Sequence, residues 1–152
     1  MSTLKAKIRA DLTSAMKARD KDRAGTLRMV LSSISEAEVA GKEAKELTDE
    51  EVTTILTREA KKRREAATAF ADGGRAEQAE KETAEAAVIA DYLPEQLSAE
   101  EIVDLVSKAV EQTGAAGEGM RAMGKVMGIL TPQTKGKADG GAVAAEVRKQ
   151  LA

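Results

Sequence analysis

The residues best suited to chemistry lie between Met120 and Gly140, in the stretch MRAMGKVMGILTPQTKGKADG. Lys135 and Lys137 flank Gly136 in a short basic loop, and Asp139 stands where the N-cap of a following helix is expected. Backbone N–H groups at a helix start, beside lysine ammonium groups, are groups that bind phosphate. A capping carboxylate would compete with that phosphate. The stretch therefore predicts anion binding weaker than in a dedicated phosphate loop.

Two short helices are expected to hold this loop. The first carries Met120, Met123, Met127 and Leu130 on one face and ends at Thr131-Pro132, because proline cannot donate an intrahelical hydrogen bond and biases the residue before it away from helix. The loop then covers residues 133–138. The second helix begins at the Asp139 cap and runs to about Leu151, with Val143, Val147 and Leu151 facing inward.

The chain lacks the residues that most catalytic sites use. It contains no Cys and no His, which excludes a thiolate nucleophile, a disulfide, and the commonest general base and metal ligand. No G-x-x-x-x-G-K-[ST] phosphate loop occurs either. Four acids, Glu77, Glu80, Glu82 and Glu85, lie close together, but without histidine or a D-x-D-x-D-G pattern we expect a solvated helix face. We expect no catalytic residue, no metal and no cofactor.

Composition predicts an all-α protein. The 152 residues include one Phe, one Tyr and no Trp, so any core consists of Ala, Leu, Val, Ile and Met. Strong helix formers dominate, and no segment sustains the alternation that a strand requires. No apolar run reaches the roughly 20 residues of a membrane span, and the first residues lack the apolar segment of a secretory signal. The cytoplasm is the expected location, with no membrane partner.

Charge is distributed unevenly along the chain. Residues 1–35 carry eight Lys or Arg against three acids, residues 36–119 carry ten against 21, and residues 120–152 carry six against two. Both ends are basic and the middle is acidic, although the formal net charge is only −2. Local asymmetry of this kind matters for polyanion binding more than the total charge does, and random clustering of charge on a solvated helical surface is the alternative explanation.

Periodicity divides the chain into two helical parts. Residues 1–93 are expected to form a bundle of about four helices, over about Thr3–Arg19, from an Asp22 cap to Gly41, from a Thr48 cap with Glu51 at N3 through Phe70, and over about Arg75–Tyr92. Residues 94–152 are expected to form a small three-helix domain. It opens with a Ser98 and Glu101 capping box, in a helix that Gly114 closes, and it includes the two helices described above.

Two further basic groups have an ordinary explanation. Five cations surround the turn after the first helix: Lys17, Arg19, Lys21, Arg23 and Arg28. An exposed turn is favoured over an RNA contact there. The run Lys61-Lys62-Arg63-Arg64 cannot share one helix face, since each residue turns about 100 degrees. We therefore expect a solvated helix surface in that run.

An ordered set of short motifs resembles the GatB/YqeY family, the small proteins similar to the carboxy-terminal part of the B subunit of the aminoacyl-tRNA amidotransferase. The motifs are Leu27-Arg28-Met29, Gly74-Arg75 followed by Glu82, Tyr92-Leu93-Pro94, Gln96-Leu97-Ser98, Gly124-Lys125-Val126-Met127 and Gly136-Lys137-Ala138-Asp139-Gly140. Each is weak alone, but together they span nearly the whole chain in order. The resemblance implies an amino-terminal helical domain and a small carboxy-terminal tail domain.

The resemblance also implies a function. In the amidotransferase the tail domain is associated with gripping tRNA, while other parts carry out the ATP-dependent and glutamine-dependent chemistry. A carbon-nitrogen ligase label would thus belong to the longer relatives, and this chain is expected to be a tRNA-binding accessory protein. An amidotransferase or other translation proteins would be further partners. The residues expected to contact phosphate are Arg121, Lys125, Lys135, Gly136, Lys137, Arg148 and Lys149.

The sequence is also compatible with two other functions. The face with Met123, Met127 and Leu130 could dock a partner helix, since methionine adapts to varied surfaces, but packing in the core is the favoured role of these residues. An amidotransferase activity of the chain alone is the third hypothesis. It would require a catalytic constellation that the sequence does not display.

Overall fold

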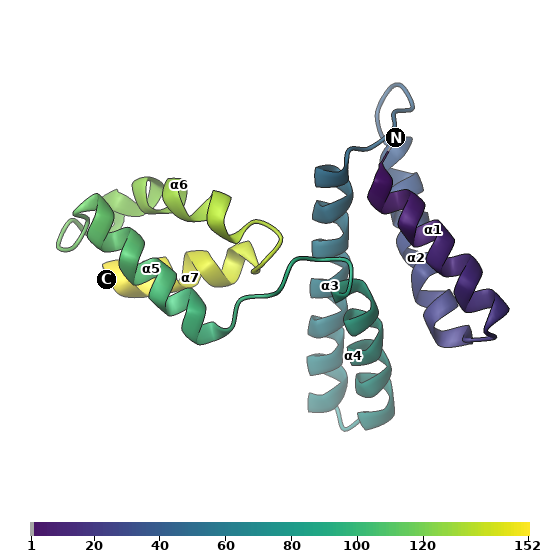
Figure 1. The fold of residues 1–152 in the computed structure, drawn as a ribbon. Coiled ribbons are helices and arrows are strands. Elements are labelled where there is room, and N and C mark those ends of the chain that lie inside the picture. Colours follow the sequence, from purple (N-terminus) through teal and green to yellow (C-terminus); the bar gives the residue numbers. More distant parts are fainter. Residues whose placement is uncertain (1) are drawn as a thin grey trace. The chain divides into compact units, whose positions relative to one another are not determined.

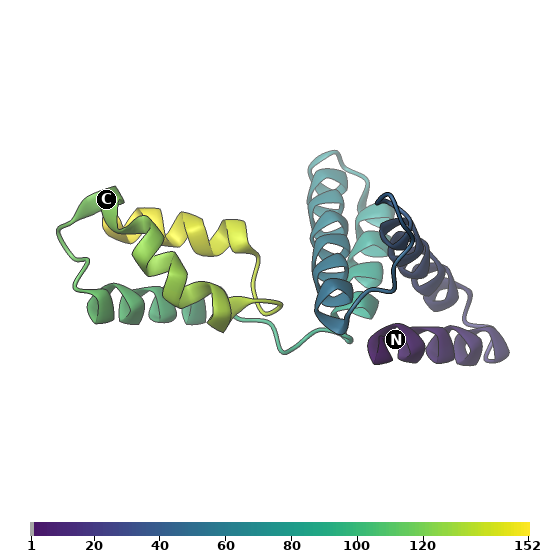
Figure 2. The same ribbon diagram turned by 90° about the horizontal axis from the view of Figure 1, so that it is seen from above.

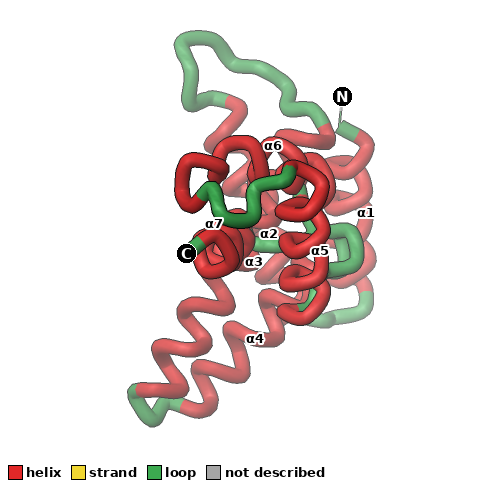
Figure 3. The backbone as a smooth tube through the Cα atoms, turned by 90° about the vertical axis from the view of Figure 1, so that its left-hand side faces the viewer, coloured by secondary structure: helices red, strands yellow, loops and turns green. Residues whose placement is uncertain are grey.

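The computed structural model describes residues 2–152, and within that range all regular structure is helical. Seven α-helices and one short 3-10 helix follow one another among the described residues, without a strand (Figure 3). The all-α prediction is confirmed. The chain divides into two compact units, the first ending at Leu93 and the second formed by Pro94–Ala152.

The first unit consists of two helical hairpins. Helices α1 (Thr3–Lys17) and α2 (Lys21–Glu38) form one, and α3 (Asp49–Asp72) and α4 (Ala76–Ala90) form the other (Figure 1). Their apolar stripes meet in one core, whose buried members are Ile8, Leu27, Val30, Ile34, Leu47, Val52, Leu56, Ala60 and Ile89. No aromatic residue belongs to that buried set, so small aliphatic side chains fill the interior.

Polar side chains cap the starts of α2 and α3, but the cap of α2 is a different residue from the one predicted. Thr48 caps α3 as expected, because its hydroxyl accepts a hydrogen bond from the Glu51 N–H at 3.2 Å. The prediction that Asp22 caps α2 is wrong. Asp20 is the cap, and its carboxylate accepts from the N–H of Arg23, three residues on, at 3.1 Å.

Asp49 ties the start of α3 to the start of α1. Its carboxylate accepts hydrogen bonds from the hydroxyls of Ser2 and Thr3, each at 2.5 Å, and from the N–H of Leu4 at 3.1 Å. The carboxylate therefore faces the N-terminal ends of two helices, where negative charge is stabilised. The hydrogen bonds from Ser2 and Thr3 lower the pKa of Asp49 from 3.8 to about 2.

A second polar connection surrounds Arg63 on α3. Its guanidinium contacts the carboxylate of Glu59 at 3.2 Å, and Nε lies 3.5 Å from Glu85 and 3.8 Å from Glu82 on α4. Met29 on α2 also touches the guanidinium through its sulfur. The expected solvated surface is thus wrong for Arg63 and for both α4 acids. Arg63 lies one helical turn after the buried Glu59, so its side chain faces the protein interior and not solvent.

The second unit contains α5 (Ala99–Thr113), a 3-10 helix η1 (Gly119–Ala122), α6 (Met123–Thr134) and α7 (Gly140–Leu151). The Ser98 capping box opens α5 as predicted, and Gly114 ends it with φ of +65°. The core is again aliphatic, with Val106, Ala109, Val110, Ala115, Ala122, Val126, Leu130, Val143, Val147 and Leu151 buried.

Helix α6 differs from the expectation at both ends. Met120 lies in η1 and is 52% exposed, so it does not belong to the inward face. Pro132 lies inside the last turn and does not end the helix. The turn continues because the N–H of Lys135 donates to the Thr131 carbonyl at 3.0 Å, and the buried Thr134 hydroxyl donates to the Leu130 carbonyl at 3.0 Å. The last turn thus keeps these two hydrogen bonds, although Pro132 cannot donate one of its own.

We predict that Asp49→Asn makes the stability of the first unit less dependent on pH. The folded state lowers the pKa of Asp49, so its contribution is fully present above the unfolded-state pKa and is lost as the pH falls through about 2. The difference in melting temperature between wild type and variant should be largest near neutral pH. It should close as acid is added. Asp72→Asn, at the opposite end of α3, is the control, and an equal pH profile for both variants would contradict this role.

Arg63→Met should destabilise the first unit by roughly 3 kcal/mol, because it leaves Glu59, Glu82 and Glu85 without their shared cation. Urea denaturation followed by circular dichroism measures the free energy of unfolding. The exposed neighbour provides a matched control, since Arg64→Met should stay within about 0.5 kcal/mol of wild type. Equal losses in the two variants would show that the charge cluster contributes nothing specific.

Candidate functional site

Residues 96 and 97, which precede α5, form hydrogen bonds with the loop between α6 and α7. The Gln96 side-chain amide donates to the Gly136 carbonyl at 2.8 Å, and the Leu97 N–H donates to the Lys137 carbonyl at 2.8 Å. Gly136 is itself buried and has φ of +75°, a conformation that L residues with side chains rarely adopt. Gly136 therefore shapes the loop through its backbone, while Lys135 and Lys137 on either side are exposed.

Asp139 caps α7, as the sequence predicts. Its carboxylate accepts a hydrogen bond from the Gly141 N–H at 3.2 Å. The N-terminal end of this helix thus already faces a negative charge. An anion at the loop would depend on Lys135 and Lys137 more than on the helix start.

The structure separates the predicted phosphate-contacting residues into two groups. Helices α6 and α7 form an antiparallel hairpin, with the Lys135 and Lys137 loop at one end and the carboxy-terminus at the other (Figure 2). Each helix has 12 residues and is about 18 Å long. The second group, Arg121, Lys125, Arg148 and Lys149, belongs to the far end, where η1 contacts α7.

All four residues of the far group are exposed. Arg148 and Lys149 follow the buried Val147 in the last turn of α7. Each step turns about 100 degrees around the helix, so their side chains lie outside the buried face. Lys125 forms an ion pair with Glu118 at 3.8 Å, and both side chains are largely solvated. A pair of that kind is weak and does not prevent a phosphate contact.

Charge is segregated inside the second unit. Residues 94–119, which contain α5, carry one lysine against six acids, whereas residues 120–152 carry six cations against two acids. The acids of α5 are Glu100, Glu101, Asp104 and Glu111, and all four are exposed. The α6–α7 hairpin is therefore the cationic part of this unit, and α5 is its acidic part.

The methionine face of α6 packs against the core of the second unit. Leu130 is fully buried, and Met123 and Met127 pack against the aliphatic cluster of the second unit. This agrees with the favoured role of these residues in the sequence. Met120 is the exposed one, in η1.

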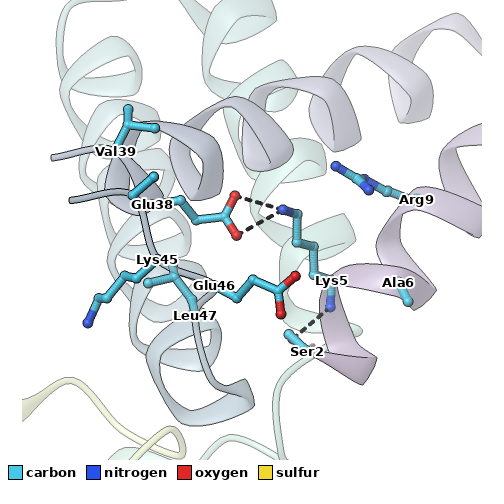
Figure 4. Close-up of a pocket in the computed structure, with 10 residues that line it drawn as sticks. Ser2, Lys5, Ala6, Arg9, Glu38, Val39, Lys45, Glu46 and Leu47 are labelled. Carbon is cyan, nitrogen blue, oxygen red and sulfur yellow. Dashed lines mark hydrogen bonds and ion pairs between the residues drawn. The ribbon is translucent and has the colours of Figure 1, made fainter.

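A cavity of about 560 Å³ lies in the first unit, between α1 and the chain that follows α2. Lys5 and Glu38 meet on its lining, with Nζ 2.7 and 2.9 Å from the two carboxylate oxygens, and Arg9 comes from the next turn of α1 (Figure 4). Both paired side chains are mostly buried. The ion pair therefore joins α1 to α2 at this cavity.

The tyrosine of the Tyr92-Leu93-Pro94 motif is also structural. Its hydroxyl donates to the Asp11 carboxylate at 2.5 Å, and Lys7 Nζ lies 5.5 Å from the ring centre. Burial and the Asp11 hydrogen bond raise the pKa of Tyr92 well above its usual value. The phenol therefore stays protonated near neutral pH and acts as a hydrogen-bond donor between α1 and the end of α4.

Two kinds of site are not found in the part of the chain that the structure describes. Residues 2–152 contain no group of three or more Asp, Glu, His or Cys side chains placed to hold a metal ion. None of the helices in the same range is long and apolar enough to cross a bilayer.

Sequence reasoning missed the role of Gln96 and Leu97 in building the loop. The sequence shows the two residues only as part of the Gln96-Leu97-Ser98 motif, and the contacts they make join positions 40 residues apart. Local patterns carry no information about such a contact. The one hint in the sequence is that the Gln96-Leu97-Ser98 motif and the motif from Gly136 to Gly140 belong to the same set of family motifs.

Comparison with known proteins identifies the family. Over 96 residues the chain is 40% identical to an uncharacterized protein of Schizosaccharomyces pombe, and the match covers 62% of this chain and 76% of the yeast protein. Residues 5–151 match the family described as Yqey-like protein, which confirms the resemblance found in the sequence motifs. With nearly its whole length matched, the chain belongs to the YqeY-like protein family.

Proposed function

We propose that this protein is a tRNA-binding accessory protein of translation, and that the α6–α7 hairpin makes the RNA contacts. The family is similar to the carboxy-terminal part of the amidotransferase B subunit, and that similarity supports an RNA partner. Binding without a catalytic centre fits the residues available, because the chain has neither histidine nor cysteine.

The observation that carries the proposal is the segregation of charge within the second unit. Six cations lie on α6, α7 and their flanks, whereas α5 is acidic, and a local excess of positive charge attracts a polyanion. Lysine and arginine bind phosphate through charge-assisted hydrogen bonds. The acidic α5 would repel RNA, so it would restrict the contact to the hairpin.

Recognition would depend on the shape of the RNA. Residues 94–152 contain no Phe, Tyr or Trp, so bases cannot stack on aromatic side chains of the second unit. The two cationic groups lie at opposite ends of a hairpin about 18 Å long. A folded RNA with phosphates at both ends of that span would engage both groups, whereas a flexible single strand would lose entropy in doing so.

The double variant Lys135→Ala/Lys137→Ala should bind a tRNA transcript about tenfold more weakly. Its plot of log affinity against log salt should be shallower by roughly 1.5 to 2, because about two phosphate contacts are lost. Fluorescence anisotropy over a range of salt concentrations gives both quantities. Arg148→Ala/Lys149→Ala should behave in the same way.

Lys108→Ala is the control for the loss of a cation outside the hairpin. Lys108 is exposed like the other lysines but lies on the acidic α5. Its loss should leave affinity and slope within error of wild type. The proposal is wrong if neither double variant changes the salt slope, or if a single-stranded RNA of equal length binds as tightly as the tRNA.

Gly136→Ala should weaken tRNA binding without changing the salt slope. The substitution removes no charge, but φ of +75° strains an alanine by about 1 kcal/mol and disturbs the loop that places Lys135 and Lys137. The same anisotropy titrations measure this effect, and thermal unfolding checks that the second unit remains folded. An unchanged affinity would mean that the shape of the loop does not matter for the contact.

A further inference from the structure

A groove of about 610 Å³ lies at the turn between α1 and α2, in the first unit. It has an apolar floor and a cationic rim. Ala15 and Ala24 form the floor, and both are almost fully buried. The exposed Met16 forms a wall.

Met16 is an apolar side chain that the fold leaves uncovered. It follows Leu12 by one helical turn on α1, and Leu12 packs against the core of the first unit. Met16 lies on the same apolar face of α1 as Leu12, but it is 53% exposed. A flexible thioether beside two buried alanines is a surface that adapts to an apolar side chain of a partner.

The rim of the groove carries Arg19, Lys21 and Arg28. The one acid that lines it, Asp20, already accepts the Arg23 N–H as the cap of α2. The groove therefore has an excess of positive charge around an apolar floor. Its complement is a ligand with an apolar centre and negative flanks.

Arg19 has an unusual backbone conformation for its side chain. Its φ is +59°, in the left-handed region where glycine is the usual residue at the end of a helix. The Asp20 N–H closes this turn by donating to the Ala15 carbonyl at 2.9 Å. The turn thus places the Arg19 guanidinium at the rim of the groove, although a glycine at this position would have less backbone strain.

We propose that this groove binds an acidic amphipathic segment of a partner protein. An apolar side chain of the segment would contact Met16 between Ala15 and Ala24, and its carboxylates would pair with Arg19, Lys21 and Arg28. A nucleic acid fits less well, because no aromatic residue lines the groove and an apolar floor contributes nothing to a phosphate contact. The site is independent of the RNA contact proposed for the second unit.

The test uses the full chain and a synthetic helical peptide of about 16 residues, roughly four turns. The peptide has Leu at four-residue spacing, Glu on both flanks and a fluorescein label. A matched peptide replaces each Leu with Ser and keeps the charge. Anisotropy should show that the Leu peptide binds at least about tenfold more tightly than the Ser peptide, because the apolar floor discriminates between them.

Two variants of the groove and one control locate the contact. Arg28→Glu should weaken binding of the Leu peptide about tenfold or more, and Met16→Ser should weaken it about fivefold. Lys17→Glu makes the same charge change at the end of α1, on an exposed residue that does not line the groove. It should change the affinity less than about twofold at physiological salt, where exposed charges are screened.

Circular dichroism and thermal unfolding of each variant separate lost binding from lost folding, and all three substituted residues are exposed. The proposal is overturned if the Ser peptide binds as well as the Leu peptide, if Lys17→Glu weakens binding as much as Arg28→Glu, or if the Leu peptide does not bind. Displacement of the peptide by tRNA would also overturn it, since the groove would then bind RNA. The Lys135→Ala/Lys137→Ala variant should retain full peptide binding, so the outcome is independent of the proposed RNA function.

Discussion

The shortage of large side chains is the constraint on which this structure depends. With one Phe, one Tyr and no Trp, both cores consist of small aliphatic residues that each bury little area. Polar contacts between distant segments therefore share the task of fixing the helices. Asp49 connects two helix starts, Arg63 connects α3 to α4, and the Gln96 amide connects the segment before α5 to the loop after α6.

The same constraint favours a function at the surface. A thin helical core leaves little room for a deep, dry pocket, and the polar pair in the cavity of the first unit neutralises itself. What the chain does offer is charge arranged on helix ends and turns. The cationic hairpin of the second unit and the groove between α1 and α2 in the first unit are both of this kind, and the groove has an apolar floor besides its charge.

Much of the helical organisation could be predicted from the sequence, including the Thr48, Ser98 and Asp139 caps. The candidate site was less predictable. The sequence predicts seven residues that contact phosphate, and the structure places them at the two ends of the hairpin and buries Gly136. The inward turn of Arg63 was also missed, because a run of four cations has the same composition whether one of them meets acids from another helix or all of them meet water.

The sequence by itself determined the helical class, the helix starts capped by Thr48, Ser98 and Asp139, and the distribution of charge along the chain. These features depend on interactions within about one helical turn, which a local pattern records directly. Only the tertiary structure decided that α6 continues through Pro132, that Arg63 gathers three carboxylates, and that Asp49 holds the start of α1. Each of these outcomes depends on burial or on a partner from another element, up to 47 residues away, and a local pattern contains neither.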